Sequence, residues 1–360
     1  MKPTPERTQR KGRGALSNPD VRFEPYAREA VDDGWGSLDE PLAALKTTVG
    51  EDHPRRAIAW NDSPDVPFDR SINPYRGCEH GCIYCFARPD HARIGLSPGQ
   101  DFESRLVRKV GAAARLEDEL RKPGYTPAPI TLGANTDPYQ PIEKRFRVTR
   151  EILEVLAAFR HPVSIVTKGT LVERDLDLLA GMAEWNGAEV MVSLTSRDAR
   201  IKRTLEPRAA SPMRRLELVE RLSAAGVRVG ALIAPVIPAI TDHELEDLVA
   251  SAATAGASSA GYVLLRLPRE VESLFREWLE LHYPDRAAHV LDLLAQSHHG
   301  RHYDSTFGHR QRGSGAYADM IGQRFRAACR KAGIESGSRN ALSSEHFRVP
   351  PRAGDQLGLF

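Results

Sequence analysis

Three of the four cysteines lie in one short stretch, residues 73–90, which reads N-P-Y-R-G-C-E-H-G-C-I-Y-C-F-A-R-P-D. Cys78, Cys82 and Cys85 are spaced C-x3-C-x2-C. Iron–sulfur clusters are held by thiolates, and a cubane needs four of them, so three thiolates from one loop leave one iron free. Gly77 and Gly81 allow the backbone to turn tightly between the thiols. The spacing therefore predicts a [4Fe-4S] cluster with one open coordination position.

A structural zinc site is the alternative reading of the same loop. Zinc prefers a closed tetrahedral set of ligands. Three thiolates would then need one further donor, which His80 or His91 could supply. In that case the chain could be a non-catalytic, metal-stabilised module that binds nucleic acid.

The bulk composition narrows the protein class. The chain has 360 residues, and its 50 Lys and Arg nearly balance its 48 Asp and Glu, so a nucleic-acid contact would need a local basic patch. No apolar run reaches the roughly 18–20 residues of a membrane span, and the N-terminus carries no hydrophobic signal segment. Clustered cysteines are typical of a metal or redox loop in a reducing compartment. We therefore expect a cytoplasmic protein without a membrane association.

Strand and helix patterns alternate after the cysteine loop, which predicts an α/β fold with a parallel sheet. The expected strands are Ser71–Tyr75, Ile130–Ala134, Val163–Thr167, Ala188–Thr195, Val227–Val236 and Gly261–Leu267. The expected helices are Phe102–Lys122, Thr149–Phe159, Val172–Trp185, Ser211–Ala225, Asp242–Thr254 and Arg269–Leu281. Six such units fit a partial (β/α)6 barrel, with a doubly wound sheet as the alternative. In both folds, the loops after the strands form the active face.

Changes in composition divide the chain into five segments. The expected division is a basic disordered arm (1–20), an N-terminal extension (21–67) with a short helix near Leu38–Lys46, the core (68–281), a basic helical region (282–335) and a flexible tail (336–360). A helix is expected at Ala316–Ala332. Seven basic residues and two acidic ones lie between Arg301 and Lys331, which could contact phosphates or form a solvated face.

The cysteine spacing, with an aromatic residue before the third cysteine, resembles the radical S-adenosylmethionine (SAM) superfamily. From about Ile72 to Leu267 the chain is similar to spore photoproduct lyase and its uncharacterised relatives. The matching stretches are A-N-T-D-P-Y-Q-P-I-E (Ala134–Glu143), S-I-V-T-K (Ser164–Lys168), V-S-L-T (Val192–Thr195), L-E-P-R-A-A-S-P (Leu205–Pro212) and A-G-V-R-V-G-A-L-I-A-P-V-I-P (Ala225–Pro238).

The resemblance implies cofactors and their contacts. SAM would bind the open iron through its amino and carboxylate groups, and an electron from the cluster would cleave it to a 5′-deoxyadenosyl radical. Lys168 and Ser193 match the family's SAM contacts, Thr195 lies in the same matching stretch as Ser193, and Thr136 matches a hydroxyl after the second strand. A solvated loop lysine is the alternative for Lys168. An electron donor such as flavodoxin or ferredoxin is implied.

Two positions depart from the lyase pattern. The lyase has a cysteine where this chain has Ala134, and a tyrosine where this chain has Phe86. The lyase cysteine returns a hydrogen atom to the substrate radical and the tyrosine belongs to the same relay, so the fate of that radical should differ here. Tyr84 and Tyr139 remain as candidates for a catalytic radical relay. Cys329, the fourth cysteine, is expected to pack in the core.

The segment Ala134–Arg147 is the best candidate for a substrate-binding loop. It combines amides, carboxylates and cations, which could hydrogen-bond to and neutralise a nucleotide. An ordered turn fixed by its two prolines is the alternative. The candidate substrate contacts are Asn135, Asp137, Gln140, Glu143 and Arg145.

The last five residues, Q-L-G-L-F, resemble the peptide that binds the bacterial sliding clamp. Such a peptide docks a few anchors into a groove. Gln356 would hydrogen-bond at the rim, and Leu357, Leu359 and Phe360 would fill the apolar pocket. A frayed terminus is the alternative. Together with the lyase resemblance, this tail favours a nucleic-acid substrate, with damaged DNA first and RNA, a protein or a small molecule as alternatives.

Overall fold

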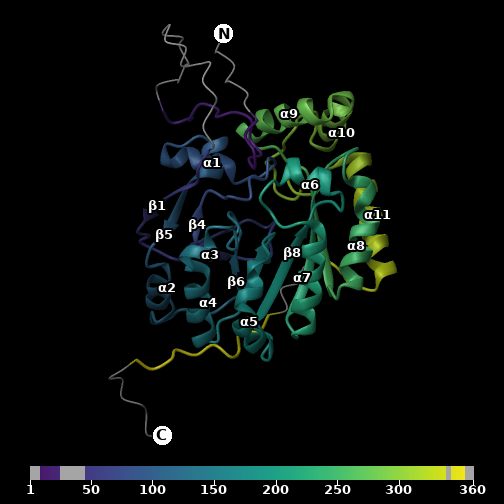
Figure 1. Ribbon diagram of the computed structural model, residues 1–360. Coiled ribbons are helices and arrows are strands. Elements are labelled where there is room, and N and C mark those ends of the chain that lie inside the picture. Colours follow the sequence, from purple (N-terminus) through teal and green to yellow (C-terminus); the bar gives the residue numbers. More distant parts are fainter. Residues whose placement is uncertain (1–8, 25–44, 338–341, 353–360) are drawn as a thin grey trace.

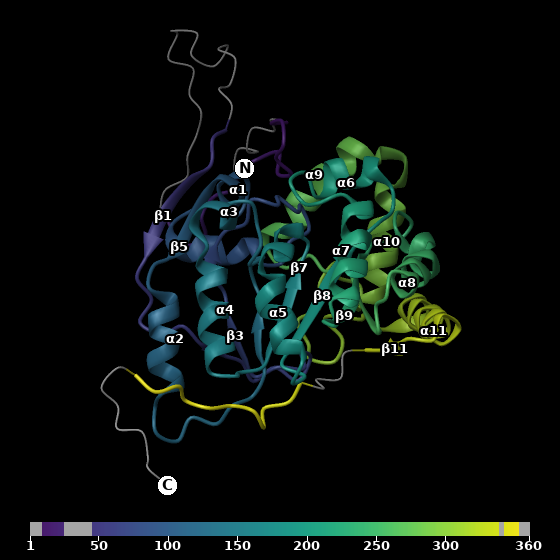
Figure 2. The same cartoon turned by 60° about the horizontal axis from the view of Figure 1, so that its bottom comes forward.

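The computed structural model describes residues 9–24, 45–337 and 342–352. Its main sheet has eight strands in the order β11-β10-β9-β8-β7-β6-β3-β2 (Figures 1 and 2). All neighbours from β3 to β11 pair in parallel, and only the edge strand β2 is antiparallel. The strands are β2 Ala59–Trp60, β3 Arg70–Ile72, β6 Ile130–Leu132, β7 Val163–Thr167, β8 Ala188–Leu194, β9 Arg228–Val236, β10 Ser259–Leu264 and β11 Glu335–Ser336.

The strand order follows the chain order, which confirms the α/β fold of a partial barrel. Each parallel pair is joined by a crossover that contains a helix, and helices cover the sheet (Figure 2). Every residue of β8 is buried, as expected for a central strand covered on both faces. Within the described residues the sheet stays open between β2 and β11. The helices of the crossovers between β6 and β10 are α3 Glu143–Phe146, α4 Val148–Ala158, α5 Leu176–Ala183, α6 Ala199–Leu205, α7 Pro212–Ala224 and α8 Leu245–Thr254.

The predicted helix Phe102–Lys122 is wrong in its middle. The structure has helix α1 Gln100–Ser104, strand β5 Arg105–Lys109 and helix α2 Ala112–Leu120. Strand β5 pairs with β1 Thr48–Asp52 and with β4 Tyr75–Arg76 in a separate three-stranded sheet. Apolar spacing alone suggested a helix, but pairing with two distant strands decides the local structure, because tertiary contacts outweigh weak propensity.

The C-terminal region packs against the last units of the sheet. It contains α9 Glu270–His282, α10 Ala287–Ser297 and α11 Gly315–Ala332, and α11 lies against α8 (Figure 1). The helix expected at Ala316–Ala332 is therefore confirmed, whereas α10 and strand β11 were not expected. Cys329 on α11 is buried in the main core. Among the described residues, no helix has both the length and the apolar character of a membrane span.

Part of the predicted disordered arm is ordered. Arg13, Ala15, Leu16 and Ser17 are all at most 7% exposed. Ser17 donates a hydrogen bond to Glu277 on α9, and its carbonyl accepts one from the backbone of Gln100. The prediction of a disordered arm is wrong for this stretch, because its small and apolar residues fit between α1 and α9. Residues 1–8 and most of the helix expected near Leu38–Lys46 lie outside the described residues.

Candidate active site

The cysteine loop follows β3 and β4, at the edge of the sheet where the parallel strands end. Gly77 and Gly81 have φ angles of +72° and +69°, which favour glycine. A Cβ atom on Gly77 would lie 2.8 Å from the backbone oxygen of Phe102, so the loop has no room for a side chain there. The backbone of Cys78 donates to the same Phe102 oxygen at 2.9 Å. Helix α1 thus holds the first cysteine in place.

A buried ion pair supports the other half of the loop. Arg88 is fully buried and donates to the backbone oxygens of Cys82 at 2.9 Å and Gly81 at 3.2 Å. Its charge is neutralised by the carboxylate of Glu103 on α1, which is also fully buried. Glu103 accepts two further hydrogen bonds from the backbone of Gly14 and Ala15, at 2.8 and 2.9 Å. The ordered N-terminal stretch, α1 and the cysteine loop therefore form one packed unit.

The three thiols lie close to one another and carry raised pKa values. Burial raises the pKa of Cys78, and Asp137, Cys82 and Cys85 raise it further. Burial also raises the pKa of Cys82, to about 12, although the nearby Lys168 lowers it. A thiol of this kind is protonated at neutral pH and becomes a thiolate when a cation compensates the charge. The loop therefore suits a strongly positive centre such as the irons of a cluster.

A single zinc ion would need donors that converge on one point. Among the described residues, no three His, Cys, Asp or Glu side chains converge to hold one metal ion. A cubane makes a different demand, because each of its thiolates binds a separate iron. His80 pairs with Asp137 at 3.3 Å, and a ring nitrogen of His91 lies 3.0 Å from the backbone oxygen of Arg105. Both histidines proposed as a fourth zinc ligand are thus engaged elsewhere.

A polar network lies on the other side of the loop. Its centre is Glu206, which follows α6 and is 1% exposed. Its carboxylate accepts hydrogen bonds from Tyr84, from Thr195 at 2.8 Å and from the buried Arg215. Burial would raise the pKa of Glu206, but Arg215 and Lys168 lower it to about 2. Glu206 is therefore ionised, and it fixes two of the predicted site residues, Tyr84 and Thr195.

Two predicted cofactor contacts beside this network have unused bonding capacity. The Ser193 hydroxyl is 1% exposed and has no hydrogen-bond partner in the structure. The Lys168 ammonium lies 5.9 Å from the centre of the Tyr84 ring. Burial would lower the pKa of Lys168, but Cys82 and Glu206 raise it, so it is a cation. A buried donor and a nearby cation without a bonded acid suit the carboxylate of an amino-acid-like ligand.

Most of the predicted substrate contacts face the protein instead. Gln140 is fully buried and connects the backbone of Glu79 and Gly77 in the cysteine loop. Asp137 accepts hydrogen bonds from Thr167 and from the backbone of Lys168, both at 2.7 Å. Thr136 is 3% exposed, and its hydroxyl donates to the Tyr75 backbone at 2.8 Å. These three residues join the loop after β6 to the cysteine loop, to β4 and to the end of β7.

Glu143 and Tyr139 belong to a separate buried cluster. Glu143 is 0% exposed and binds Tyr75, Arg174 and the backbone of Thr149, so the prediction of a substrate contact is wrong for it. Tyr139 is 1% exposed and donates to Asp175 at 3.0 Å, which gives it a structural contact. Asn135 is half-buried, and its side-chain amide donates to Asp90 at 3.1 Å. Arg145 is exposed and stacks on Phe146.

Sequence reasoning missed several residues that build this site. Glu206 lies in the L-E-P-R stretch that carried the family resemblance, and that match could have identified it. Arg88, Glu103 and Arg215 offered no local signal, because each acts through partners that lie outside its own element and are brought to it by the fold. Arg266 was also missed. It follows β10, and its guanidinium stacks on Phe86 beside the third cysteine.

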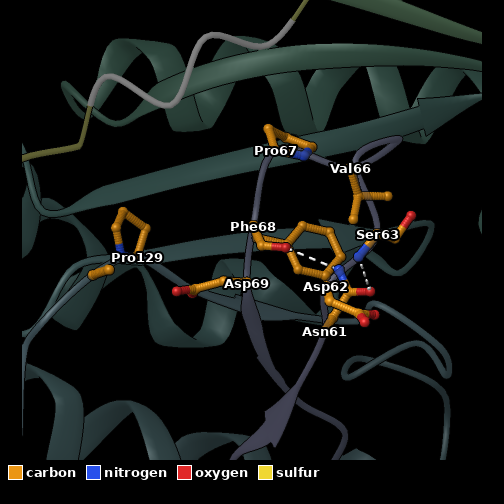
Figure 3. A pocket seen from close by; sticks show the side chains of 9 residues that line it. Asn61, Asp62, Ser63, Val66, Pro67, Phe68, Asp69 and Pro129 are labelled. Carbon is orange, nitrogen blue, oxygen red and sulfur yellow. Dashed lines mark hydrogen bonds between the residues drawn. The ribbon is translucent and has the colours of Figure 1, made fainter. Parts of the chain in front are cut away.

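The pocket in Figure 3 lies away from this site. It has a volume of ≈ 430 Å³. Its lining comes from the loop between β2 and β3 and from Pro129 just before β6, at the edge where the strands begin (Figure 3). The cysteine loop lies at the opposite edge, so this pocket is not the candidate active site. The lining residues are Asn61, Asp62, Ser63, Val66, Pro67, Phe68, Asp69, Ala128 and Pro129.

Comparisons with known proteins agree with this geometry. The family model described as the Radical SAM superfamily matches residues 72–252. An uncharacterised protein of Mycobacterium tuberculosis is 39% identical over 230 residues, which are 63% of this chain and 68% of that protein. An uncharacterised protein of Methanocaldococcus jannaschii is 31% identical over 178 residues, which are 48% of this chain and 62% of that protein.

Among solved structures, spore photoproduct lyase complexed with dinucleoside spore photoproduct has the same fold. The TM-score is 0.59 at 16% identity, and the match covers 80% of this chain and 81% of the lyase. The family model spans the cysteine loop and four complete strands of the parallel sheet, β6 to β9. This chain therefore belongs to the radical SAM superfamily and is a radical SAM enzyme, which uses a [4Fe-4S] cluster and SAM.

Proposed function

We propose that Cys78, Cys82 and Cys85 bind the cluster and that SAM lies between the cysteine loop and the ends of β7 and β8. The unpartnered Ser193 hydroxyl on β8 and the Lys168 cation just after the neighbouring strand β7 carry this proposal. When bound, the cluster and SAM would supply radical chemistry, in which one electron from the cluster would split SAM into methionine and a 5′-deoxyadenosyl radical. Lys168 and Ser193 bind the SAM carboxylate.

The surrounding residues hold these groups in place. Glu206 orients the hydroxyls of Tyr84 and Thr195, and Asp137 fixes the backbone that carries Lys168. Arg88 and Glu103 hold the loop backbone, so the cysteines need little rearrangement when the cluster assembles. An electron donor such as flavodoxin or ferredoxin would reduce the cluster. All described cysteines are free thiols, which suits the reducing cytoplasm.

We propose a nucleic acid, with damaged DNA first, as the substrate. The lyase with the same fold is named in complex with a dinucleoside photoproduct. The described segment from Arg301 to Lys331 adds positive charge, although Arg324 on α11 is neutralised by Glu246. Ala134 and Phe86 lack the thiol and hydroxyl of the lyase, so the fate of the substrate radical should differ from that in the lyase. RNA, a protein or a small molecule is the alternative substrate.

The sliding clamp is the proposed partner. Its expected contacts, Gln356, Leu357, Leu359 and Phe360, lie outside the described residues. Deleting 356–360 should abolish retention by an immobilised clamp, and equal retention of the full-length and shortened chains would contradict the proposal.

Anaerobic reconstitution tests the cluster assignment. The wild-type protein should contain iron and sulfide near four per chain and should release 5′-deoxyadenosine when it is reduced with SAM. Cys82→Ala should abolish this release, whereas Cys329→Ala, which removes the thiol buried on α11, should retain it. One zinc per chain without 5′-deoxyadenosine would support the non-catalytic module instead.

The substrate class needs a separate assay. The assay compares four candidate substrates: ultraviolet-irradiated DNA, undamaged DNA, RNA and a peptide mixture. Each is tested for stimulation of 5′-deoxyadenosine release and, in deuterated form, for transfer of deuterium into the 5′-deoxyadenosine. Stimulation by irradiated DNA above the other three would support damaged DNA. Stimulation by RNA or peptides alone would contradict it.

A further inference from the structure

The side chains of Phe86 and Arg266 meet beside the third cysteine. Phe86 directly follows Cys85 and is 43% exposed, although large aromatic side chains are usually covered. The Arg266 guanidinium lies 4.3 Å from the centre of the Phe86 ring. Arg266 follows the last residue of β10 by two positions, so this pair connects the cysteine loop with the far side of the parallel sheet. Phe86 therefore presents a partly exposed ring next to the third cysteine.

The charge of Arg266 is not neutralised by a bonded acid. The structure shows no ion pair or hydrogen bond from its guanidinium to any described residue, although the side chain is partly buried. The carboxylate of Asp65 is nearby, but it forms an ion pair with Arg310 and accepts a hydrogen bond from the backbone of Gly308 at 2.6 Å.

The guanidinium of Arg310 also lies near Arg266, although its charge is paired with that of Asp65. Burial lowers the pKa of Arg266, the phenol of Tyr303 raises it and Arg310 lowers it again. Arg266 nevertheless remains a cation at neutral pH, because the ordinary pKa of arginine is far above that range. An anionic ligand could therefore form an ion pair with Arg266, which no acid of the described chain does.

We propose that Phe86 and Arg266 form a nucleotide subsite, in which a base stacks on the free face of Phe86 and a phosphate binds the Arg266 guanidinium. Any base can stack on an aromatic ring, and the N–H donors of a planar guanidinium match the geometry of a phosphate. The subsite deepens the proposed nucleic-acid function and rests on it. It also gives Phe86 a role: the ring keeps the stacking surface while it lacks the hydroxyl of the lyase.

Fluorescence anisotropy with a labelled single-stranded oligonucleotide tests the subsite on the reconstituted full-length enzyme. Arg266→Gln should weaken binding about tenfold at moderate salt and reduce the salt dependence by about one phosphate contact. Phe86→Leu should weaken it about tenfold with the salt dependence unchanged. Arg203→Gln removes an exposed charge from α6 and serves as the matched control, with expected binding near wild type. Cluster content confirms that each variant is folded.

The outcomes separate the subsite from the broader function. Absence of oligonucleotide binding by the wild-type enzyme would overturn the proposed nucleic-acid function and the subsite with it. Wild-type binding that Arg266→Gln and Phe86→Leu leave unchanged would overturn the subsite alone. A raised KM for SAM in Arg266→Gln, with unchanged oligonucleotide binding, would assign Arg266 to the cofactor and would also overturn the subsite.

Discussion

The two sides of the cysteine loop differ in how fully their polar groups are used. On the packed side, Arg88 and Glu103 are completely buried, and together they bond to the loop, to α1 and to the N-terminal stretch. On the open side, the Ser193 hydroxyl lacks a partner, and Lys168 and Arg266 are cations without a bonded acid in the described structure. The packed side fixes the backbone, and the open side is left for ligands to complete.

The largest effect should come from breaking the packed side. Glu103→Ala leaves the Arg88 charge buried without its partner, which typically costs about 3–5 kcal/mol of folding free energy. We expect a large loss of stability in anaerobic denaturant unfolding and little cluster after reconstitution. Glu184→Gln, which changes an exposed carboxylate on the surface, is the control. Wild-type stability of Glu103→Ala would show that the ion pair does not hold the loop.

A smaller disturbance of the same side should act mainly on the cluster. A Cβ atom on Gly14 would lie 2.1 Å from the backbone oxygen of Gly81, so Gly14→Val must push the N-terminal stretch off the loop. We expect the visible absorbance of the cluster to fade several-fold faster in air. Gly181→Ala is the control, because a Cβ atom there meets no atom within 4 Å. Equal decay rates would mean that residues 13–17 do not shield the cluster.

The open side should respond in cofactor affinity rather than in folding. Lys168→Met removes a charge-assisted hydrogen bond to the SAM carboxylate, worth about 1.5–3 kcal/mol. We expect SAM to bind about tenfold or more weakly in calorimetry on the reconstituted protein. Lys144→Met removes an exposed lysine of α3 and should leave the affinity unchanged. If Lys168 is only a solvated loop lysine, both variants should bind SAM with the wild-type affinity.

The smallest effect distinguishes the two sides most clearly. Ser193→Ala deletes a buried hydroxyl that the protein leaves unbonded, so unfolding free energy should stay level or rise slightly. SAM affinity should still fall a few-fold, because a neutral hydrogen bond contributes about 1 kcal/mol. Thermal unfolding and SAM titration measure the two quantities. A loss of stability without a loss of SAM affinity would place Ser193 on the structural side.

Local patterns predicted most of the parallel sheet. Strand β7 has the predicted bounds, and α7 begins directly after Ser211, the first residue of the expected helix, whose hydroxyl caps it. Strand β5 was missed because its residues have helical spacing and become a strand only through pairing with β1 and β4. Ser193 was predicted as a cofactor contact, but the sequence could not show that its hydroxyl is buried without a partner.

The sequence by itself determined the chemistry that the loop can support, since three thiols at fixed short spacing can reach three corners of one cluster wherever the loop lies. It also determined the βα order, because burial of both sheet faces imposes continuous apolar strands. Only the tertiary structure decided which polar residues serve the fold. Folding brings Glu79 to Gln140 and Arg174 to Glu143, so both of these residues are buried and bonded. Folding brings the uncharged ring of Phe86 to Arg266, so Arg266 keeps its charge without a bonded acid, as Lys168 does.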